Sequence, residues 1–170
     1  HSFNGNQRLA VLCLIFATTY IIPLIILFLF KKFKLLKSFQ AETIKERKIP
    51  IAMMIVLFYL LGNTLQNIPN LSDIGLLFYA TTLGLSFIYI LFAFKLKTSI
   101  HLLSLGISAG FFMVLTNNYS QSFLIIIIII FLLSGLLASA RLNLKAHTSK
   151  EIYIGFFSGV FSPIILSFIL

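Results

Sequence analysis

Apolar segments of about the length needed to cross a lipid bilayer recur along the whole chain, and they constrain its fold more than any other feature. A transmembrane helix needs about 20 mainly apolar residues. Of the 170 residues, 59% are hydrophobic and only 10% are charged. The sequence therefore predicts an integral membrane protein with spans at about 9–30, 50–68, 74–94, 100–117, 122–140 and 152–170.

The continuous apolarity of these segments identifies them as helices rather than strands of a membrane barrel. Barrel strands alternate in polarity, because alternate side chains face the lumen. Leu124 to Leu133 is apolar at every position and contains the isoleucine run Ile125 to Ile130. Only a helix carries such a run through lipid while satisfying its own backbone hydrogen bonds. We predict an all-α fold in which residues 1–170 form one bundle of six transmembrane helices, since the connections are too short for a soluble domain.

Basic residues gather in the segments that six crossings would place on one side of the membrane. Of the 13 Lys and Arg, 12 lie in the ranges 31–49, 95–99 and 141–151. The positive-inside rule places such loops in the cytoplasm. It accounts for a juxtamembrane group that can also bind anionic lipid headgroups: Lys31, Lys32, Lys34 and Lys37. The basic surplus does not require nucleic acid as a partner, because no ladder of aromatic residues with basic residues interleaved appears.

The first span and its flanks bear on processing and on metal binding. Cys13 is the only cysteine and lies inside the first span, so neither a disulfide nor a thiolate metal cluster is expected. No small-residue cleavage site follows a short apolar core, which favours a true span over a signal peptide. The start His1-Ser2-Phe3 lacks an initiator Met and is consistent with a processed or truncated product.

Two histidines lie at the edges of predicted spans on the basic side. His101 opens the fourth span, and His147 precedes Glu151 by four residues. If the chain is helical there, imidazole and carboxylate share a face, and the carboxylate can orient the ring and make its far nitrogen more nucleophilic. A histidine at a membrane edge also serves as an ordinary interfacial hydrogen-bonding residue. The spacing is therefore compatible with a nucleophile and its orienting carboxylate as well as with a purely structural role.

Two pairs of glycines are expected to pack helices rather than to bind a ligand. They are spaced as small-xxx-small motifs, which let helices approach closely in lipid: Gly106 with Gly110, and Gly155 with Gly159. Close packing at these pairs would bring the segments that carry His101 and His147 together. At the opposite face, Asp73 follows Ser72 and is expected to cap the third span.

The segment from Ala140 to Glu151 resembles a signature of the type 2 phosphatidic-acid phosphatase and vanadium haloperoxidase superfamily. That signature is Ser-Arg, five residues, His, three residues, Asp. Arg141 and His147 match it. Ala140 replaces the Ser, and Glu151 replaces the Asp.

Two further segments are similar to the other signatures of that superfamily. Ser99 and His101 keep the Ser and His of Pro-Ser-Gly-His. Arg47 and Pro50 keep a basic residue and the Pro of Lys, six residues, Arg-Pro, but no Lys stands at the required distance upstream. Over about residues 40–165 the chain resembles a short bacterial branch of multi-span, phosphatase-like proteins.

The resemblance implies metal-free and cofactor-free hydrolysis of a lipid phosphate or lipid pyrophosphate in the bacterial cytoplasmic membrane. His147 would attack phosphorus to give a phosphohistidine, with Glu151 orienting it and His101 protonating the leaving alkoxide. Basic and hydroxyl side chains would hold the phosphoryl oxygens: Arg141, Arg47, Lys48, Lys97 and Ser99. Membrane lipids are the implied partners, and an anionic lipid phosphate is the implied substrate.

Two other functions and the orientation stay open. The extra methylene of Glu151 could shift the imidazole by about 1 Å, which can cost on the order of 100-fold in rate, so the same bundle is alternatively an inactive accessory or structural subunit of a membrane protein complex. His101 and His147 could instead ligate haem, although adjacent Arg and Lys suit an anion better. The positive-inside rule places the motif face in the cytoplasm, whereas sites of the resembled phosphatases usually face outward.

Overall fold

The computed structural model describes residues 4–32 and 43–170, and every regular element in these ranges is helical. The all-α prediction is thus confirmed for this part of the chain. His1, Ser2, Phe3, Lys34 and Lys37 lie outside the described residues. In chain order the elements are α1 (Gly5–Phe16), the π-helical turn η1 (Ala17–Ile21), α2 (Ile22–Lys32), α3 (Ile44–Gln66), α4 (Ser72–Leu91), the 3-10 turn η2 (Phe92–Phe94), α5 (Ile100–Tyr119), α6 (Leu124–Asn143) and α7 (Ser149–Ser167).

Five helical segments within residues 4–32 and 43–170 are long and apolar enough to cross a membrane. α7 stands where the sixth span was predicted, but it is not among the five. Its sequence includes Lys150, Glu151 and several serines, which lower its apolarity. The five segments are Gly5–Lys32, Ile44–Gln66, Ser72–Phe94, Ile100–Tyr119 and Leu124–Asn143.

α3 begins six residues earlier than the predicted span at 50, because a capping box precedes it. The backbone N–H of Glu46 donates to the Thr43 hydroxyl at 3.3 Å, and the Glu46 carboxylate accepts from the Thr43 N–H at 3.4 Å. Such a reciprocal pair satisfies two donors that a helix start leaves unpaired. Arg47 and Lys48, which the sequence analysis placed in a loop, therefore lie in the first turns of α3.

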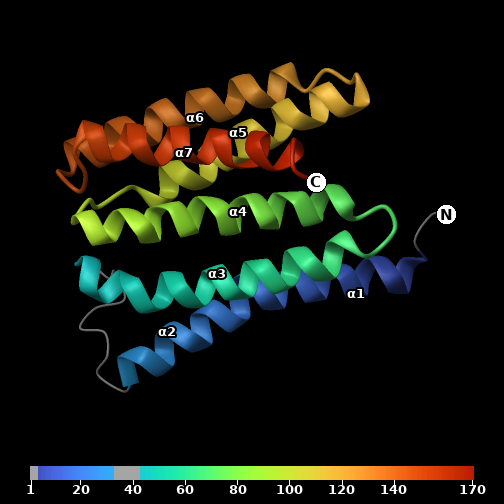
Figure 1. Cartoon of the computed structure of the whole chain (residues 1–170), viewed down its shortest axis with the longest axis horizontal. Helices are drawn as coiled ribbons and strands as arrows, with labels where there is room; N and C mark the ends of the chain where they lie inside the picture. The colour runs from blue at the N-terminus through green and yellow to red at the C-terminus, as the bar shows by residue number, and fades with distance from the viewer. Residues whose placement is uncertain (1–3, 33–42) are drawn as a thin grey trace.

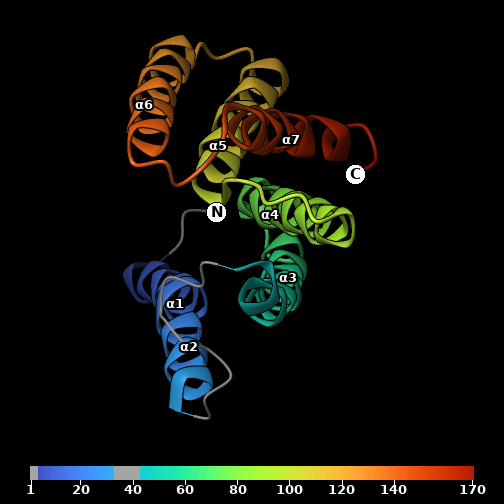
Figure 2. The same cartoon turned by 90° about the vertical axis from the view of Figure 1, so that its left-hand side faces the viewer.

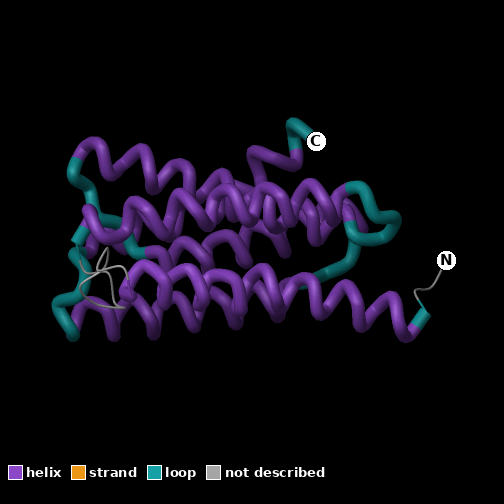
Figure 3. Tube along the Cα trace, turned by 90° about the horizontal axis from the view of Figure 1, so that it is seen from below, coloured by secondary structure: helices purple, strands orange, loops and turns teal. Residues whose placement is uncertain are grey.

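The helices form a bundle in which α4 occupies the middle. α5, α6 and α7 lie on one side of α4, and α3 lies on the other side with α1 and α2 beyond it (Figures 1 and 2). The described connections gather at the two ends of the bundle (Figure 3). The start of α3, the α4–α5 connection and the α6–α7 connection meet at one end, on the left in Figure 1. The described parts of the three charged segments therefore lie at the same end, as predicted.

Glycines allow α5 and α7 to form the most extensive helix contact in the described part of the chain. A Cβ atom at Gly106 would overlap the carbonyl oxygen of Phe156, and one at Gly159 would overlap that of Leu103. At Gly155, an added Cβ would lie 2.6 Å from the carbonyl oxygen of Ser99. The predicted packing role of the glycine pairs is confirmed, and it holds the starts of α5 and α7 together.

The prediction that Asp73 caps a helix was wrong. The cap residue of α4 is Leu71, which makes no side-chain capping hydrogen bond, and Asp73 already lies in the first helical turn. Its Oδ2 instead accepts a hydrogen bond from the hydroxyl of Tyr119 at 2.6 Å. Asp73 thus connects the start of α4 to the end of α5, at the end of the bundle away from the histidines.

The first helical segment contacts the rest of the bundle only lightly. α1, η1 and α2 contain no buried residue. Val11 and Ile15 pack against a buried cluster of α3 and α4 that contains Leu61 and Leu65. The remaining buried clusters are built from α3 to α7 and η2. The core that positions the charged end therefore lies in residues 44–167.

Candidate functional site

The contact between His147 and Glu151 is the centre of the candidate site. His147 Nδ1 lies 2.8 Å from Glu151 Oε2. The His147 side chain is only 5% exposed and that of Glu151 is 23% exposed. The expected pairing is present, and the other ring nitrogen, Nε2, has no partner among residues 4–32 and 43–170.

This contact arises from the way the chain enters α7. Thr148 is the cap residue: its hydroxyl accepts from the Glu151 N–H at 3.4 Å, and the carboxylate accepts from the Thr148 N–H at 3.3 Å. His147 precedes the cap and is therefore outside the helix. His147 and Glu151 were expected to share a face of one helix if the chain were helical there, but α7 begins after His147. The capping box turns the carboxylate back toward the imidazole instead.

A left-handed turn at Lys145 directs the chain from α6 into this arrangement. Lys145 has φ of 51°. Its N–H donates to the Leu142 carbonyl at 2.9 Å, and the Ala146 N–H donates to the Arg141 carbonyl at 3.1 Å. These are the two hydrogen bonds of a Schellman motif, in which glycine usually takes the left-handed position.

His147 and Glu151 line an open pocket of about 440 Å³, together with Lys97 and Lys145. The Lys97 ammonium donates to the Ala146 carbonyl at 3.4 Å, which ties the α4–α5 connection to the α6–α7 connection. The sequence analysis missed Lys145 and Thr148 as pocket residues. The pattern Thr, two residues, Glu is a known sign of a helix start and could have identified Thr148.

Three further basic side chains reach the site from three different helices. Arg47 of α3 donates from Nη1 to the Thr98 carbonyl at 3.5 Å. Arg47, Arg141 at the end of α6 and His147 all act electrostatically on His101 of α5. Arg47 also acts on His147. Three segments distant in sequence, around Arg47, from Lys97 to His101 and from Arg141 to Glu151, therefore contribute to one cationic site at this end of the bundle.

Ser99 and Lys48 are placed less well for contact with an anion. Ser99 is fully buried, and among the described residues neither its hydroxyl nor that of Thr98 has a hydrogen-bond partner. The Ser99 N–H donates to the Glu151 carbonyl at 3.3 Å, so its backbone joins the two histidine segments. Lys48 is exposed and contacts none of the other site residues in the described part of the chain.

Burial lowers the pKa of His147 below its ordinary 6.5. The hydrogen bond and charge of Glu151 oppose this effect, whereas the positive charges of Lys97 and Arg47 add to it. The imidazole is therefore neutral at neutral pH. With its Nδ1–H donated to the carboxylate, it presents the Nε2 lone pair to the pocket.

The described residues offer no cluster of three or more His, Cys, Asp or Glu side chains suited to a metal ion. Comparisons with protein-family models, curated proteins and solved structures find no match to the chain. The chemistry of the site must therefore be inferred from its own residues.

Proposed function

We propose that this protein is a membrane-embedded phosphatase that hydrolyses a lipid phosphate or lipid pyrophosphate through a phosphohistidine intermediate. One observation carries the proposal: the buried side chain of His147 lies 2.8 Å from Glu151 beside a pocket lined by lysines. Phosphoryl transfer needs little from a protein beyond positioning and fixed positive charge. Both requirements fit the residues gathered here.

The proposed membrane topology has six spans. The five apolar helical segments supply five of them. α7 would be the sixth, because it packs along α5, and its polar residues Lys150 and Glu151 lie at the charged end. In this topology, lipid surrounds the exposed apolar side chains of the six spans. The bacterial cytoplasmic membrane is the proposed location.

In the proposed reaction, His147 Nε2 attacks phosphorus, so that an N–P bond forms while the P–O bond to the lipid breaks. The leaving alkoxide takes a proton from His101. Water then gives a proton back to His101 as it attacks the phosphohistidine, the N–P bond breaks to restore His147, and inorganic phosphate leaves. Arg47, Arg141 and Lys97 would hold the phosphoryl oxygens, and an arginine fork suits those oxygens bidentately.

The sequence resemblance supports the same chemistry. Arg141, His147 and Glu151 have the spacing of the third signature of the type 2 phosphatidic-acid phosphatase superfamily. The starts of α5 and α7 both direct helix N-termini toward this end of the bundle, where they favour negative charge.

The test compares wild type with His147→Ala, both purified in detergent, for phosphate release from a lipid phosphate. We expect His147→Ala to abolish release and the acid-labile phosphoenzyme. His101→Ala should still form the intermediate from an activated aryl phosphate, because that leaving group needs no proton. The rate of phosphate release by Glu151→Gln should fall between those of His147→Ala and His101→Ala, since glutamine keeps a hydrogen-bond acceptor but loses the negative charge. Equal release by wild type and His147→Ala would overturn the proposal.

A second candidate is an inactive accessory subunit of a membrane complex built on the same bundle. The burial of Ser99 and the exposure of Lys48 favour it, since both were expected to touch phosphate. This candidate gains support if the chain co-purifies with a larger membrane complex and shows no turnover.

A further inference from the structure

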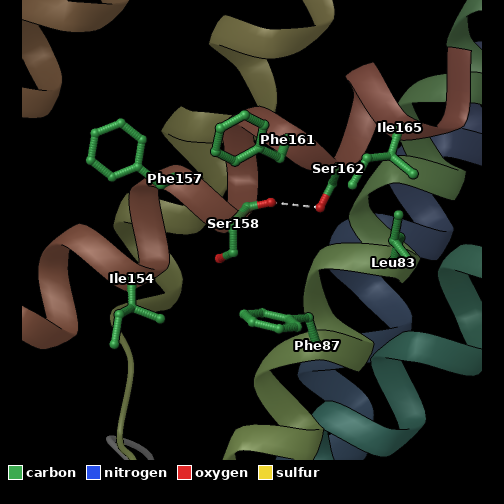
Figure 4. A pocket seen from close by; sticks show the side chains of 8 residues that line it. All are labelled: Leu83, Phe87, Ile154, Phe157, Ser158, Phe161, Ser162 and Ile165. Atoms are coloured by element: carbon green, nitrogen blue, oxygen red, sulfur yellow. Dashed lines mark hydrogen bonds between the residues drawn. The ribbon is translucent and has the colours of Figure 1, made fainter.

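An apolar groove runs between α4 and α7, starting near the candidate site. Its volume is about 470 Å³. It is lined by side chains of both helices, drawn in Figure 4: Leu83, Phe87, Ile154, Phe157, Ser158, Phe161, Ser162 and Ile165. Its two hydroxyls are already satisfied, because Ser158 donates to the Gly155 carbonyl at 2.9 Å and Ser162 donates to the Ser158 carbonyl at 2.7 Å.

We infer that this groove holds the hydrocarbon chain of the lipid phosphate whose head group occupies the pocket at His147. The inference rests on the proposed function and adds a binding site for the hydrocarbon chain of the substrate. Such a substrate is a phosphate ester with at least one long apolar chain, and the groove takes that chain.

The position of the groove supports this occupant. Glu151, Ile154, Ser158, Ser162 and Ile165 recur at intervals of three and four residues, so they follow one face of α7. The polar pocket and the apolar groove are therefore consecutive parts of the same helix surface. A molecule that enters one with its charged end reaches the other with its tail.

The length of the groove also fits. From Ile154 to Ile165 the helix rises by about 16 Å at 1.5 Å per residue. The hydrocarbon core of a bilayer is about 30 Å thick, so the groove spans about one leaflet. Chains of a lipid anchored at the charged end extend over that depth.

Charge complementarity selects a phosphorylated lipid over an uncharged one. Lys97 lines the pocket at the Glu151 end of this surface, and Arg47 interacts electrostatically there with Glu151 and Arg141. The groove itself offers no unsatisfied polar side chain. An anionic head group with an apolar tail matches both parts. Exposed aromatic side chains at the groove, Phe87 at 44% and Phe157 at 51%, give the tail a lateral entry from lipid.

The first experiment uses Leu83→Trp to narrow the groove at the end away from the candidate site. We expect the ratio of kcat/KM for hexadecyl phosphate over octyl phosphate to fall about tenfold, the equivalent of about two methylene groups leaving an apolar site. The matched control is Leu132→Trp, the same change at a 65% exposed position of α6, which should leave the ratio unchanged. An unchanged ratio in Leu83→Trp, or an equal fall in the control, would refute the inference.

The second experiment needs neither a groove variant nor turnover. A hexadecyl phosphonate that carries a diazirine at mid-chain is bound to the wild-type protein and cross-linked by light. We expect adducts on groove residues such as Phe87, Phe157 and Ser158. Vanadate added before illumination should prevent them, because it competes for the site of the phosphonate head group. An uncharged hexadecanol with the same diazirine should label them far less.

The outcomes separate the possible occupants. Equal labelling by phosphonate and hexadecanol would assign the groove to bulk lipid, and adducts of the phosphonate only outside the groove would place its chain elsewhere. Either result overturns the inference. Failure of the proposed function is recognised separately, by equal phosphate release from wild type and His147→Ala.

Discussion

At the scale of single residues, two opposing influences set the pKa of His147: burial of the imidazole and the carboxylate of Glu151. Burial is the larger and lowers the pKa. A nucleophilic histidine must be neutral before it can attack, so this balance favours the attacking form. The same balance makes the stability of the folded state depend on pH.

We expect the folded protein to lose stability as pH falls below about 6.5, the ordinary histidine pKa. The pKa of His147 is lower in the folded state, so below that pH the unfolded chain binds the proton more readily. The contribution of His147 to the stability of the folded state is fully present above pH 6.5. It is lost as the pH falls through the pKa that His147 has in the folded protein. Thermal midpoints of wild type and His147→Asn between pH 5 and 8 would measure it. Parallel pH profiles of the two proteins would contradict the expectation.

Lys145 offers a second test at this scale, because its left-handed backbone carries a side chain. The left-handed conformation costs an ordinary residue about 1–2 kcal/mol, and glycine avoids that cost. We expect Lys145→Gly to raise stability by about 0.5–1 kcal/mol, measured by chemical unfolding in detergent. The control is Lys150→Gly, inside the first turn of α7, which should lower stability by a similar amount. A loss in both variants would show that the turn at Lys145 is not strained.

The sequence predicted the pairing of His147 with Glu151 because the pair is local, and four residues of spacing keep the partners within reach. It did not predict that Ser99 would be buried. Which side chain of a helix start faces inward depends on how that helix packs, and here Gly155 lets α7 lie directly against the Ser99 carbonyl. The catalytic and phosphate-binding roles of all these residues stay predictions.

At the scale of the elements, the α5–α7 contact should be the part of the bundle most sensitive to added volume. Gly159→Ala would place a methyl group against the backbone carbonyl of Leu103, which cannot move aside alone. We expect a loss of about 1–3 kcal/mol, the usual cost of overpacking. The matched control is Gly135→Ala in α6, where no atom lies within 4 Å of the new Cβ. That change should be neutral or stabilising by up to about 1 kcal/mol. Equal effects in chemical unfolding would show that the close approach does not constrain the fold.

Element identity could be predicted from the sequence, but element boundaries could not. Apolar length alone predicted where helices occur, since a lipid-exposed backbone has few alternatives. It could not predict that α3 starts at Ile44, because Thr43 and Glu46 are polar and lie outside any apolar window. Side-chain capping extends these helices beyond the apolar segments, and it moves Arg47 onto a helix.

At the scale of the whole molecule, the proposed topology predicts which connections share a side of the membrane. In a Cys13→Ser background, single cysteines at Lys95 and Lys145 should be labelled by an impermeant maleimide from the same side. Cysteines at Asn70 and Ser120 should be labelled from the other side, since all four positions are exposed. The positive-inside rule assigns the lysine connections to the cytoplasm. Labelling of Lys95→Cys and Lys145→Cys from opposite sides would contradict the six-span arrangement.

The two histidine segments are joined by main-chain atoms, through the Ser99 N–H and the Glu151 carbonyl. The two atoms of that hydrogen bond are present whatever side chain stands at positions 99, 101, 147 or 151, except for proline at 99, which has no N–H. Natural drift could therefore erase the chemistry of such a site one side chain at a time while the protein continued to fold. In a lineage built on this architecture, selection on stability alone would not distinguish members that keep these side chains from members that have lost them.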